Sequence, residues 1–284
     1  MGDRILCAQE FYAGVARYMA GVDPAWEGER WREQLAAEPA ILRAALGEGR
    51  GRSALDCACG GGGQAIPLAQ LGWRVTGADI TASSLEAAAR RAGEAGVAAD
   101  WRAGDMRDLG AAFQDAFDAV VCCMALDNLT ADEDIQLAVR GIFAAFKPGG
   151  RCYLRQRDFD TIMGNRPRYE VREGRRVPHG RVIRLEDWDY ECETRVICAY
   201  VFLREDTRKE GYRWDAAIFR YRRRALRKAE LERHVRAAGF EHIAFLPQRS
   251  PWAPYEVVAS KPTDDLPRQP ARVSKPSGGR CGCR

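Results

Sequence analysis

An apolar segment that runs directly into a glycine-rich loop constrains this chain more than any other feature of its sequence. Residues 54–57 read Ala-Leu-Asp-Cys, and residues 60–63 are four consecutive glycines, after which a helical pattern begins. Glycine is needed where the backbone turns with a positive φ or where a ligand approaches the chain closely. The spacing of Gly60, Gly62 and Ala65 also fits the dinucleotide-binding fingerprint, and a plain glycine-rich turn would use the same residues. The loop therefore predicts a strand–turn–helix unit and leaves its ligand open.

The segment around this loop alternates short apolar runs with helical stretches. Thr130 and Glu133 are spaced as a capping box, and Pro148 follows the end of the helix that they begin. Alternation of this kind is typical of a parallel α/β sheet with helices on both faces. Strands are predicted at residues 53–57, 74–78, 99–102, 119–123 and 151–155, and helices at residues 64–71, 82–95 and 131–146.

The whole chain divides into five predicted segments. Residues 1–50 read as helical, and residues 51–157 form the α/β core. Residues 158–223 contain β-rich runs that predict an inserted antiparallel layer. Residues 224–261 supply a final helix and two strands to the core, and residues 262–284 are predicted to be a disordered tail because they lack apolar periodicity. The β-rich runs are residues 181–185, 194–203 and 212–221, the final helix is 227–238, and the last strands are 242–247 and 255–260.

Composition and charge describe an ordinary globular protein. Of the 284 residues, 46% are hydrophobic and 30% are charged, and the net charge of +4 is small for this length. The densest basic run, residues 220–228, is interpreted as a solvated surface rather than a nucleic-acid interface. We expect a small-molecule substrate and no nucleic-acid partner, and the sequence is compatible with a homo-oligomer.

The cysteines and the apolar runs indicate in which cellular compartment the protein is expected and whether it is expected to bind a metal. No apolar stretch reaches the ~18 residues that a membrane span needs, and the first residues are too polar for a signal peptide. The 10 cysteines lie mostly in strand-like runs and lack the paired CxxC spacing of a zinc site. We therefore expect reduced thiols, no metal, no membrane association and a soluble, cytoplasmic protein.

Polar residues follow each later strand of the predicted core. Asp79 ends the second strand, where a carboxylate can accept hydrogen bonds from both hydroxyls of a ribose. Asp105 and Met106 follow the third strand, and Asp127 and Asn128 follow the fourth. Because the carboxyl ends of parallel strands meet at one edge, we expect these residues to lie around a common site.

The order and spacing of five elements resemble the class I S-adenosylmethionine-dependent methyltransferases. Any one element is common, whereas all five in this order are specific. The resemblance implies an enzyme with a Rossmann-like, doubly wound α/β fold, whose seven-stranded sheet is mostly parallel with an antiparallel last strand. It also implies a helical N-terminal lid and S-adenosylmethionine as the cofactor. The elements are Leu-Asp-x-x-Cys-Gly-x-Gly from Leu55, Asp79, Gly-Asp at 104–105, Phe-Asp-x-Val-Val from Phe117 and Lys-Pro-Gly-Gly at 147–150.

The same resemblance assigns cofactor-binding roles to individual positions. Gly60 and Gly62 would pass beneath the methionine part of the cofactor, Asp79 would bind the ribose, and Asp105 with Met106 would border the adenine. Tyr18 resembles an aromatic residue of the lid, which could equally be a core residue. The complete expected set is Tyr18, Asp56, Ala58, Gly60, Gly62, Asp79, Ile80, Asp105, Met106 and Cys122.

Beyond the cofactor half, the chain is similar to glycine and sarcosine N-methyltransferases and their bacterial relatives. The segment 154–162 matches a family segment whose arginine, here Arg157, binds the substrate carboxylate, and Tyr200 and Tyr221 match tyrosines that face the substrate. A planar guanidinium suits bidentate carboxylate binding, although Arg157 could instead pair at the surface with Asp158 or Asp160, and each tyrosine could be a core residue. The chain departs from this group after the fourth strand, where it has no histidine, which leaves the identity of the substrate open.

These observations predict a small-molecule methyltransferase that methylates the nitrogen of an amine or an amino-acid-like substrate. An amine with a pKa of about 10 must lose its proton, which costs roughly 4 kcal/mol at pH 7. Hydrogen bonds to the enzyme could then position its lone pair. Methylation of oxygen, sulfur or a ring nitrogen of a secondary metabolite, an NAD-linked oxidoreductase and a non-catalytic cofactor-binding module remain alternatives. The candidate acceptor-site residues are Asp127, Asn128, Arg157, Tyr200 and Tyr221.

Overall fold

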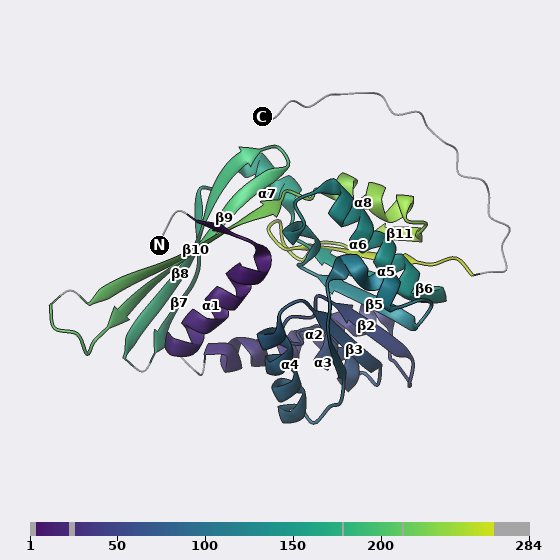
Figure 1. Cartoon of the computed structure of the whole chain (residues 1–284), viewed down its shortest axis with the longest axis horizontal. Coiled ribbons are helices and arrows are strands. Elements are labelled where there is room, and N and C mark those ends of the chain that lie inside the picture. Colours follow the sequence, from purple (N-terminus) through teal and green to yellow (C-terminus); the bar gives the residue numbers. More distant parts are fainter. Residues whose placement is uncertain (1–3, 23–25, 178, 212, 264–284) are drawn as a thin grey trace.

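The computed structural model contains two β-sheets joined by helices (Figure 1). It describes residues 4–22, 26–177, 179–211 and 213–263, so most of the predicted tail at 262–284 lies outside the described residues. Within these ranges, none of the helices is both long and apolar enough to cross a lipid bilayer.

The larger sheet has seven strands in the order β11-β12-β6-β5-β2-β3-β4. The five strands from β4 to β6 are parallel, β12 is antiparallel to β6, and β11 is antiparallel to β12. This arrangement confirms the predicted Rossmann-like sheet. The strands are β2 (Ser53–Cys57), β3 (Arg74–Asp79), β4 (Asp100–Ala103), β5 (Phe117–Cys123), β6 (Phe146–Gln156), β11 (Glu241–Phe245) and β12 (Tyr255–Ser260).

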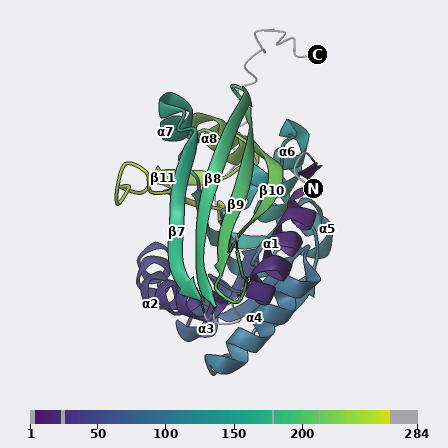
Figure 2. The same ribbon diagram turned by 90° about the vertical axis from the view of Figure 1, so that its left-hand side faces the viewer.

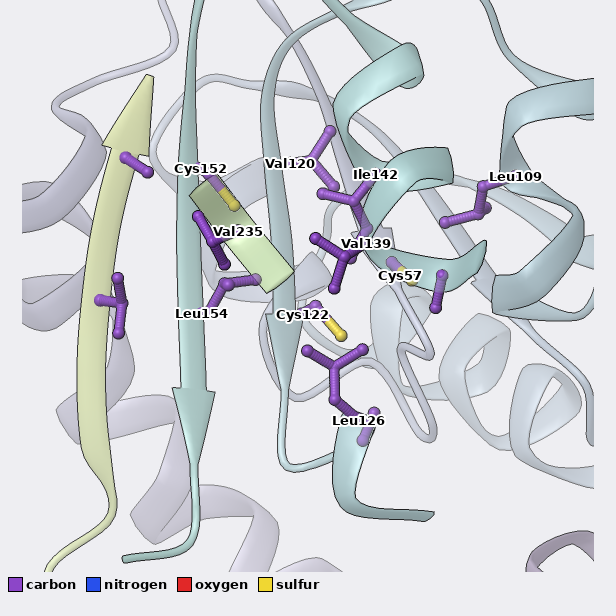
Figure 3. Packing of buried hydrophobic residues seen from close by; sticks show 14 of the residues in the cluster. Cys57, Leu109, Val120, Cys122, Leu126, Val139, Ile142, Cys152, Leu154 and Val235 are labelled. Carbon is purple, nitrogen blue, oxygen red and sulfur yellow. The ribbon is translucent and has the colours of Figure 1, made fainter. Parts of the chain in front are cut away.

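Helices cover both faces of this sheet because alternate residues of its central strands are apolar on either side. Val120 and Cys122 of β5 pack against Val139 and Ile142 of α6 (Figure 3). Ala119 and Val121 face the opposite way and pack in a second core with α2 and α3. The helices are α2 (Trp26–Leu46), α3 (Ala65–Gln70), α4 (Ala82–Glu94), α5 (Leu109–Ala112), α6 (Asp132–Ala145) and α8 (Lys228–Ala237), with short 3-10 turns η1 (Met106–Asp108) and η2 (Leu126–Asn128).

The smaller sheet has the order β1-β10-β9-β8-β7 and is antiparallel except where β1 joins β10. Its inner face packs against α1 (Ala8–Val22) and α7 (Phe159–Asn165) around Phe11, Trp188 and Phe202. The sequence predicts three of these strands and misses two. One is β7, which is rich in charged residues, and the other is the two-residue β1. The strands are β1 (Ile5–Leu6), β7 (Tyr169–Val177), β8 (Gly180–Cys192), β9 (Arg195–Asp206) and β10 (Trp214–Arg224).

A buried ion pair fastens the two sheets together. Arg223 of β10 donates a hydrogen bond to the Oδ2 atom of Asp127 in η2, and the two side chains are 1% and 0% exposed. Arg223 also donates from Nη2 to the hydroxyl of Tyr12 in α1, at 3.1 Å. The basic run that the sequence indicates as solvated surface thus contributes a fully buried arginine.

We expect Arg223→Ala to lower the free energy of unfolding by about 3–5 kcal/mol, because it leaves the carboxylate of Asp127 buried without its main partner. The neighbouring Arg222 provides the control, since it pairs with Glu191 at 2.6 Å on the surface. Arg222→Ala should cost about 1 kcal/mol or less. Urea denaturation of both variants measures the difference, and equal losses would show that the buried pair does not hold the sheets together.

Candidate functional site

The glycine-rich loop between β2 and α3 has the backbone conformation that its sequence predicts. Ala58, Gly60 and Gly62 all have positive φ angles, of 57°, 51° and 87°. No atom of the described residues lies within 4 Å of the point where a Cβ on Gly60 would be, so this part of the loop faces open space. A Cβ on Gly62 would lie 3.1 Å from Ile66 and 3.3 Å from Trp101. Gly60 therefore leaves room for a ligand, whereas Gly62 allows close packing beneath the loop.

Asp79 holds this loop in place from the end of β3. Its Oδ2 atom accepts a hydrogen bond from the backbone of Gly60 and its Oδ1 atom from the backbone of Thr81, both at 2.8 Å. Each carboxylate oxygen keeps a second lone pair for a ligand hydroxyl. The next residue, Ile80, is 45% exposed, and its carbonyl accepts from the side chain of Gln9 in α1 at 3.2 Å.

Asp56 lies beneath the loop with one oxygen unpaired. Its Oδ2 atom accepts from the backbone of Ala65 at 2.8 Å, while its buried Oδ1 atom has no hydrogen-bond partner among the described residues. Burial, together with the nearby carboxylates of Asp79 and Glu38, raises the pKa of Asp56 to about 8. A cationic group of a ligand would compensate this carboxylate, which makes the residue suited to the amino group of a cofactor.

An open pocket of about 270 Å³ lies beside Asp79, at the tips of β3 and β4. Asp105 lines it, and a bidentate contact with Arg107 lowers the pKa of its carboxyl. If an adenine amino group binds here, it must donate to a carboxylate of Asp105 that already accepts hydrogen bonds from Arg107. The sequence does not predict this contact with Arg107. Met106 packs against the core under α6. The residues that line the pocket are Ala78, Arg102, Ala103, Gly104, Asp105, Asp108, Leu109, Ala112 and Phe113.

Two residues of the expected cofactor set make packing contacts. The ring of Tyr18 packs against Phe202 and Phe219 on the smaller sheet, with ring centroids 5.3 Å and 5.9 Å apart. The side chain of Cys122 is fully buried in the core between β5 and α6 (Figure 3). The role of either residue in cofactor binding stays a prediction.

A second group of polar side chains lies buried between the two sheets, and we call Asp127, Arg157, Glu186 and Arg223 the acceptor cluster. The Nε atom of Arg157 is 3.6 Å from Asp127 Oδ2, and its Nη1 atom is 3.7 Å from Glu186 Oε2. The side chain of Arg157 is only 13% exposed, and those of Asp127 and Glu186 are 0% and 2% exposed. Two guanidinium groups thus face two carboxylates, and the charges of the cluster balance.

The pairing of Arg157 differs from the surface pair that the sequence also allows, whereas its role in binding a substrate carboxylate stays a prediction. Asp158 is engaged by Lys228 at 3.3 Å, and Asp160 accepts from the backbone of Lys228 at 3.0 Å. Arg157 is therefore not a surface residue paired with either neighbour. It is a buried residue whose charge Asp127 and Glu186 compensate.

Tyrosines from three elements surround the acceptor cluster. The hydroxyl of Tyr12 lies 3.4 Å from that of Tyr221 and 3.5 Å from the Oδ1 atom of Asn128. The ring of Tyr200 lies 6.2 Å from that of Tyr221, and burial raises the pKa of Tyr200 to about 12. The structure thus brings together all five predicted acceptor-site residues, Asp127, Asn128, Arg157, Tyr200 and Tyr221.

Three members of this site are not predicted from the sequence. Tyr12 and Glu186 are not among the predicted site residues, and Arg223 is interpreted as part of a solvated run. The alternation of Tyr221 and Arg223 along β10 is the one local signal, because it places both side chains on the same face of a strand.

Several buried polar atoms in this region have no hydrogen-bond partner in the described structure. They include Asp127 Oδ1, Arg157 Nε, Arg223 Nε and both side-chain polar atoms of Gln156. Each such atom costs about 1–3 kcal/mol, so a concentration of them is typical of a site that binds a polar ligand. The cluster offers a carboxylate acceptor and guanidinium donors within a water-poor region.

Part of the chain is similar in sequence to known methyltransferases. Residues 54–150 match the family described as a methyltransferase domain. A segment of 119 residues is 36% identical to the ubiquinone biosynthesis O-methyltransferase of Chromobacterium violaceum, covering 42% of this chain and 48% of that protein. A segment of 100 residues is 38% identical to the protein of the same name from a Methylobacterium species, covering 35% and 39%. The chain therefore spans less than half the length of either relative.

Solved structures resemble a larger part of the chain. The S-adenosylmethionine-bound amino pentose methyltransferase CalS10 of Micromonospora echinaspora has a TM-score of 0.64 at 21% identity, covering 88% of this chain and 96% of the other. The sugar N-methyltransferase KedS8 of a Streptoalloteichus species has a TM-score of 0.63 at 19% identity, covering 92% and 96%. At these identities the likeness shows the fold. Together the comparisons confirm the Rossmann-like methyltransferase fold and a methyltransferase domain over residues 54–150, which supports S-adenosylmethionine as the expected cofactor.

We expect Asp79→Ala to weaken binding of S-adenosylhomocysteine by about 2–4 kcal/mol, or roughly 30- to 1000-fold in Kd. The substitution removes the predicted acceptor for the ribose hydroxyls and the carboxylate that orders the loop at Gly60. Isothermal titration calorimetry measures the change. Asp100→Ala, at the exposed opposite end of β4, should bind as the wild type does. An unchanged Kd for the Asp79 variant would remove this residue from the cofactor site.

Proposed function

We propose that this chain, which contains a class I methyltransferase domain, transfers a methyl group from S-adenosylmethionine to the nitrogen of an amine on a small molecule. The observation that carries the proposal is the Oδ1 atom of Asp127 at the carboxyl edge of the parallel sheet, a fully buried acceptor that has no hydrogen-bond partner among the described residues. Asn128 is the next residue in the chain, and the hydroxyl of Tyr12, which accepts from the same Arg223 that binds Asp127, lies 3.4 Å from the hydroxyl of Tyr221. These groups can accept the N–H bonds of an amine.

The cofactor, when bound, supplies a methyl group carried on a positively charged sulfur. The residues of the chain then have to orient the acceptor, exclude water and hold its proton. Asp127 is fixed by Arg223 and lies close to Arg157, so its free oxygen has a defined direction. An amine that donates to this oxygen has its lone pair directed away from the carboxylate, toward an incoming methyl group.

The charge balance of the acceptor cluster bears on the substrate. Arg157 is compensated by Asp127 and Glu186, so a substrate carboxylate would have to displace one of them. This supports a neutral, polar amine more strongly than the amino-acid-like substrate implied by the resemblance to glycine and sarcosine N-methyltransferases. Because two proteins of the same fold are named as an amino pentose methyltransferase and a sugar N-methyltransferase, we propose an amine carried on a hydroxyl-rich, sugar-like molecule.

A substrate screen tests this function. The full chain is incubated with methyl-labelled S-adenosylmethionine and separate pools of amino sugars, amino acids, phenols and thiols. We expect the label in an amine of the first pool, detected by product mass and assigned to nitrogen by NMR. Labelling confined to phenols or thiols would reject N-methylation and favour the O- or S-methyl alternative. No transfer to any pool, with binding of the cofactor retained, would favour a non-catalytic module.

We further expect Arg157→Lys to raise KM for the amine about tenfold while the Kd for S-adenosylhomocysteine stays constant. Lysine keeps the positive charge but lacks the planar guanidinium group, which can donate to two hydrogen-bond acceptors at once. Steady-state kinetics with the substrate identified above measures KM, and Arg151→Lys at an exposed position in the middle of β6 is the matched control. An unaltered KM would mean that Arg157 does not contact the amine substrate.

A further inference from the structure

The face of the smaller sheet that points away from α1 carries a continuous apolar band. Val171, Leu185, Val201 and Ile218 lie directly opposite one another across β7, β8, β9 and β10. A second row of apolar residues follows in the same register, at Ile183, Leu203 and Ala216. We call these seven residues the outer band. Registered apolar neighbours on one face of a sheet are the pattern of a face that packs against another layer.

Nothing in the described part of the chain supplies that other layer. Val171 is 64% exposed and Ile218 is 44% exposed, and the band belongs to none of the hydrophobic cores. Figure 2 shows β7 to β10 lying in front of the helices, with their outer face open. An exposed apolar patch of this extent on a folded protein marks an interaction surface.

The charges that flank the band are compensated within the chain. At one end Arg181 pairs with Glu205 at 2.9 Å. At the other end Arg220 pairs with Asp189 at 3.1 Å, and Arg222 pairs with Glu191 at 2.6 Å. The flanking pairs therefore carry no net charge. These pairs would therefore not attract a strongly charged partner by charge complementarity. A second copy of the same face could approach without repulsion between like charges.

The dimensions of the face match what a stable dimer needs. Strands β8 to β10 are 13, 12 and 11 residues long. At about 3.3 Å per residue and about 4.8 Å per strand, these strands and the nine-residue β7 present a whole outer face, with the apolar band at its centre and the flanking ion pairs around it, of about 700 Å². Two such faces together bury about 1,400 Å², which lies within the range of specific interfaces.

We propose that the outer band packs against the same band of a second copy of this chain, so that two copies form an isologous homodimer through sheet-on-sheet contact. The inner face of the same strands carries Tyr200, Tyr221 and Arg223 of the acceptor site. Each copy keeps a complete acceptor site, and the contact braces the sheet from behind.

Sedimentation velocity on the full chain tests the dimer. We expect a species of twice the chain mass of 31.6 kDa at micromolar concentration. The double variant Val171→Lys/Ile218→Lys should dissociate it and raise the dimer Kd at least about a hundredfold, because it buries lysine ammonium groups in an apolar contact. Both residues are exposed in the single chain, so the variant should fold, which circular dichroism and a thermal melt verify. Leu137→Lys, at a 50% exposed leucine of α6, is the matched control and should remain dimeric.

Three results would overturn the proposal. The first is a monomeric wild type at tens of micromolar, as expected if another molecule or a segment outside the described residues covers the band. The second is a dimer that persists in the folded double variant, which would place the contact elsewhere, such as at the open edge of β7. The third is a dimer that dissociates when salt is raised from about 0.1 to 1 M, since an apolar contact resists screening.

Discussion

The carboxylate of Asp127 is the point on which both halves of the molecule depend. It lies at the carboxyl edge of the parallel sheet, is fully buried, and meets Arg223 from the smaller sheet and Arg157 from the end of β6. A buried charge is tolerated only when its partners stay in place, so the position of the smaller sheet is tied to the chemistry of the larger one. The same arrangement leaves the Oδ1 atom of this carboxylate without a hydrogen-bond partner among the described residues.

The predicted cofactor site and the proposed acceptor site are built in different ways. The cofactor half relies on backbone geometry, because the positive φ of Gly60 and the hydrogen bonds to Asp79 shape the loop without help from distant residues. The acceptor half relies on side chains from α1, η2, β6, β8 and β10, whose arrangement exists only when both sheets are assembled. The backbone geometry of the cofactor half can be shared among many methyltransferases, whereas the side chains of the acceptor half can change with the substrate.

The different construction of the two sites explains which parts of the molecule the sequence predicts and which it does not. The parallel strands, the loop at Gly60 and the strand-end Asp79 are encoded by local patterns of apolar, glycine and acidic residues, and their positions are confirmed. The strand β7 is missed because its charged residues show no apolar alternation. Arg223 is missed because charge density along a segment predicts exposure, whereas its partner Asp127 lies 96 residues earlier in the chain. Pairing over that distance becomes visible only in the folded protein.

Helix α1 touches both binding regions within a single turn. Gln9 bonds to the carbonyl of Ile80 beside the cofactor edge, and Tyr12 contacts Asn128, Tyr221 and Arg223 at the acceptor site. Residues three apart lie on the same face of a helix, so Gln9 and Tyr12 project from one side of α1. A single helix therefore links the loop after β3 to the acceptor cluster, and a substitution that shifts α1 would disturb both regions together.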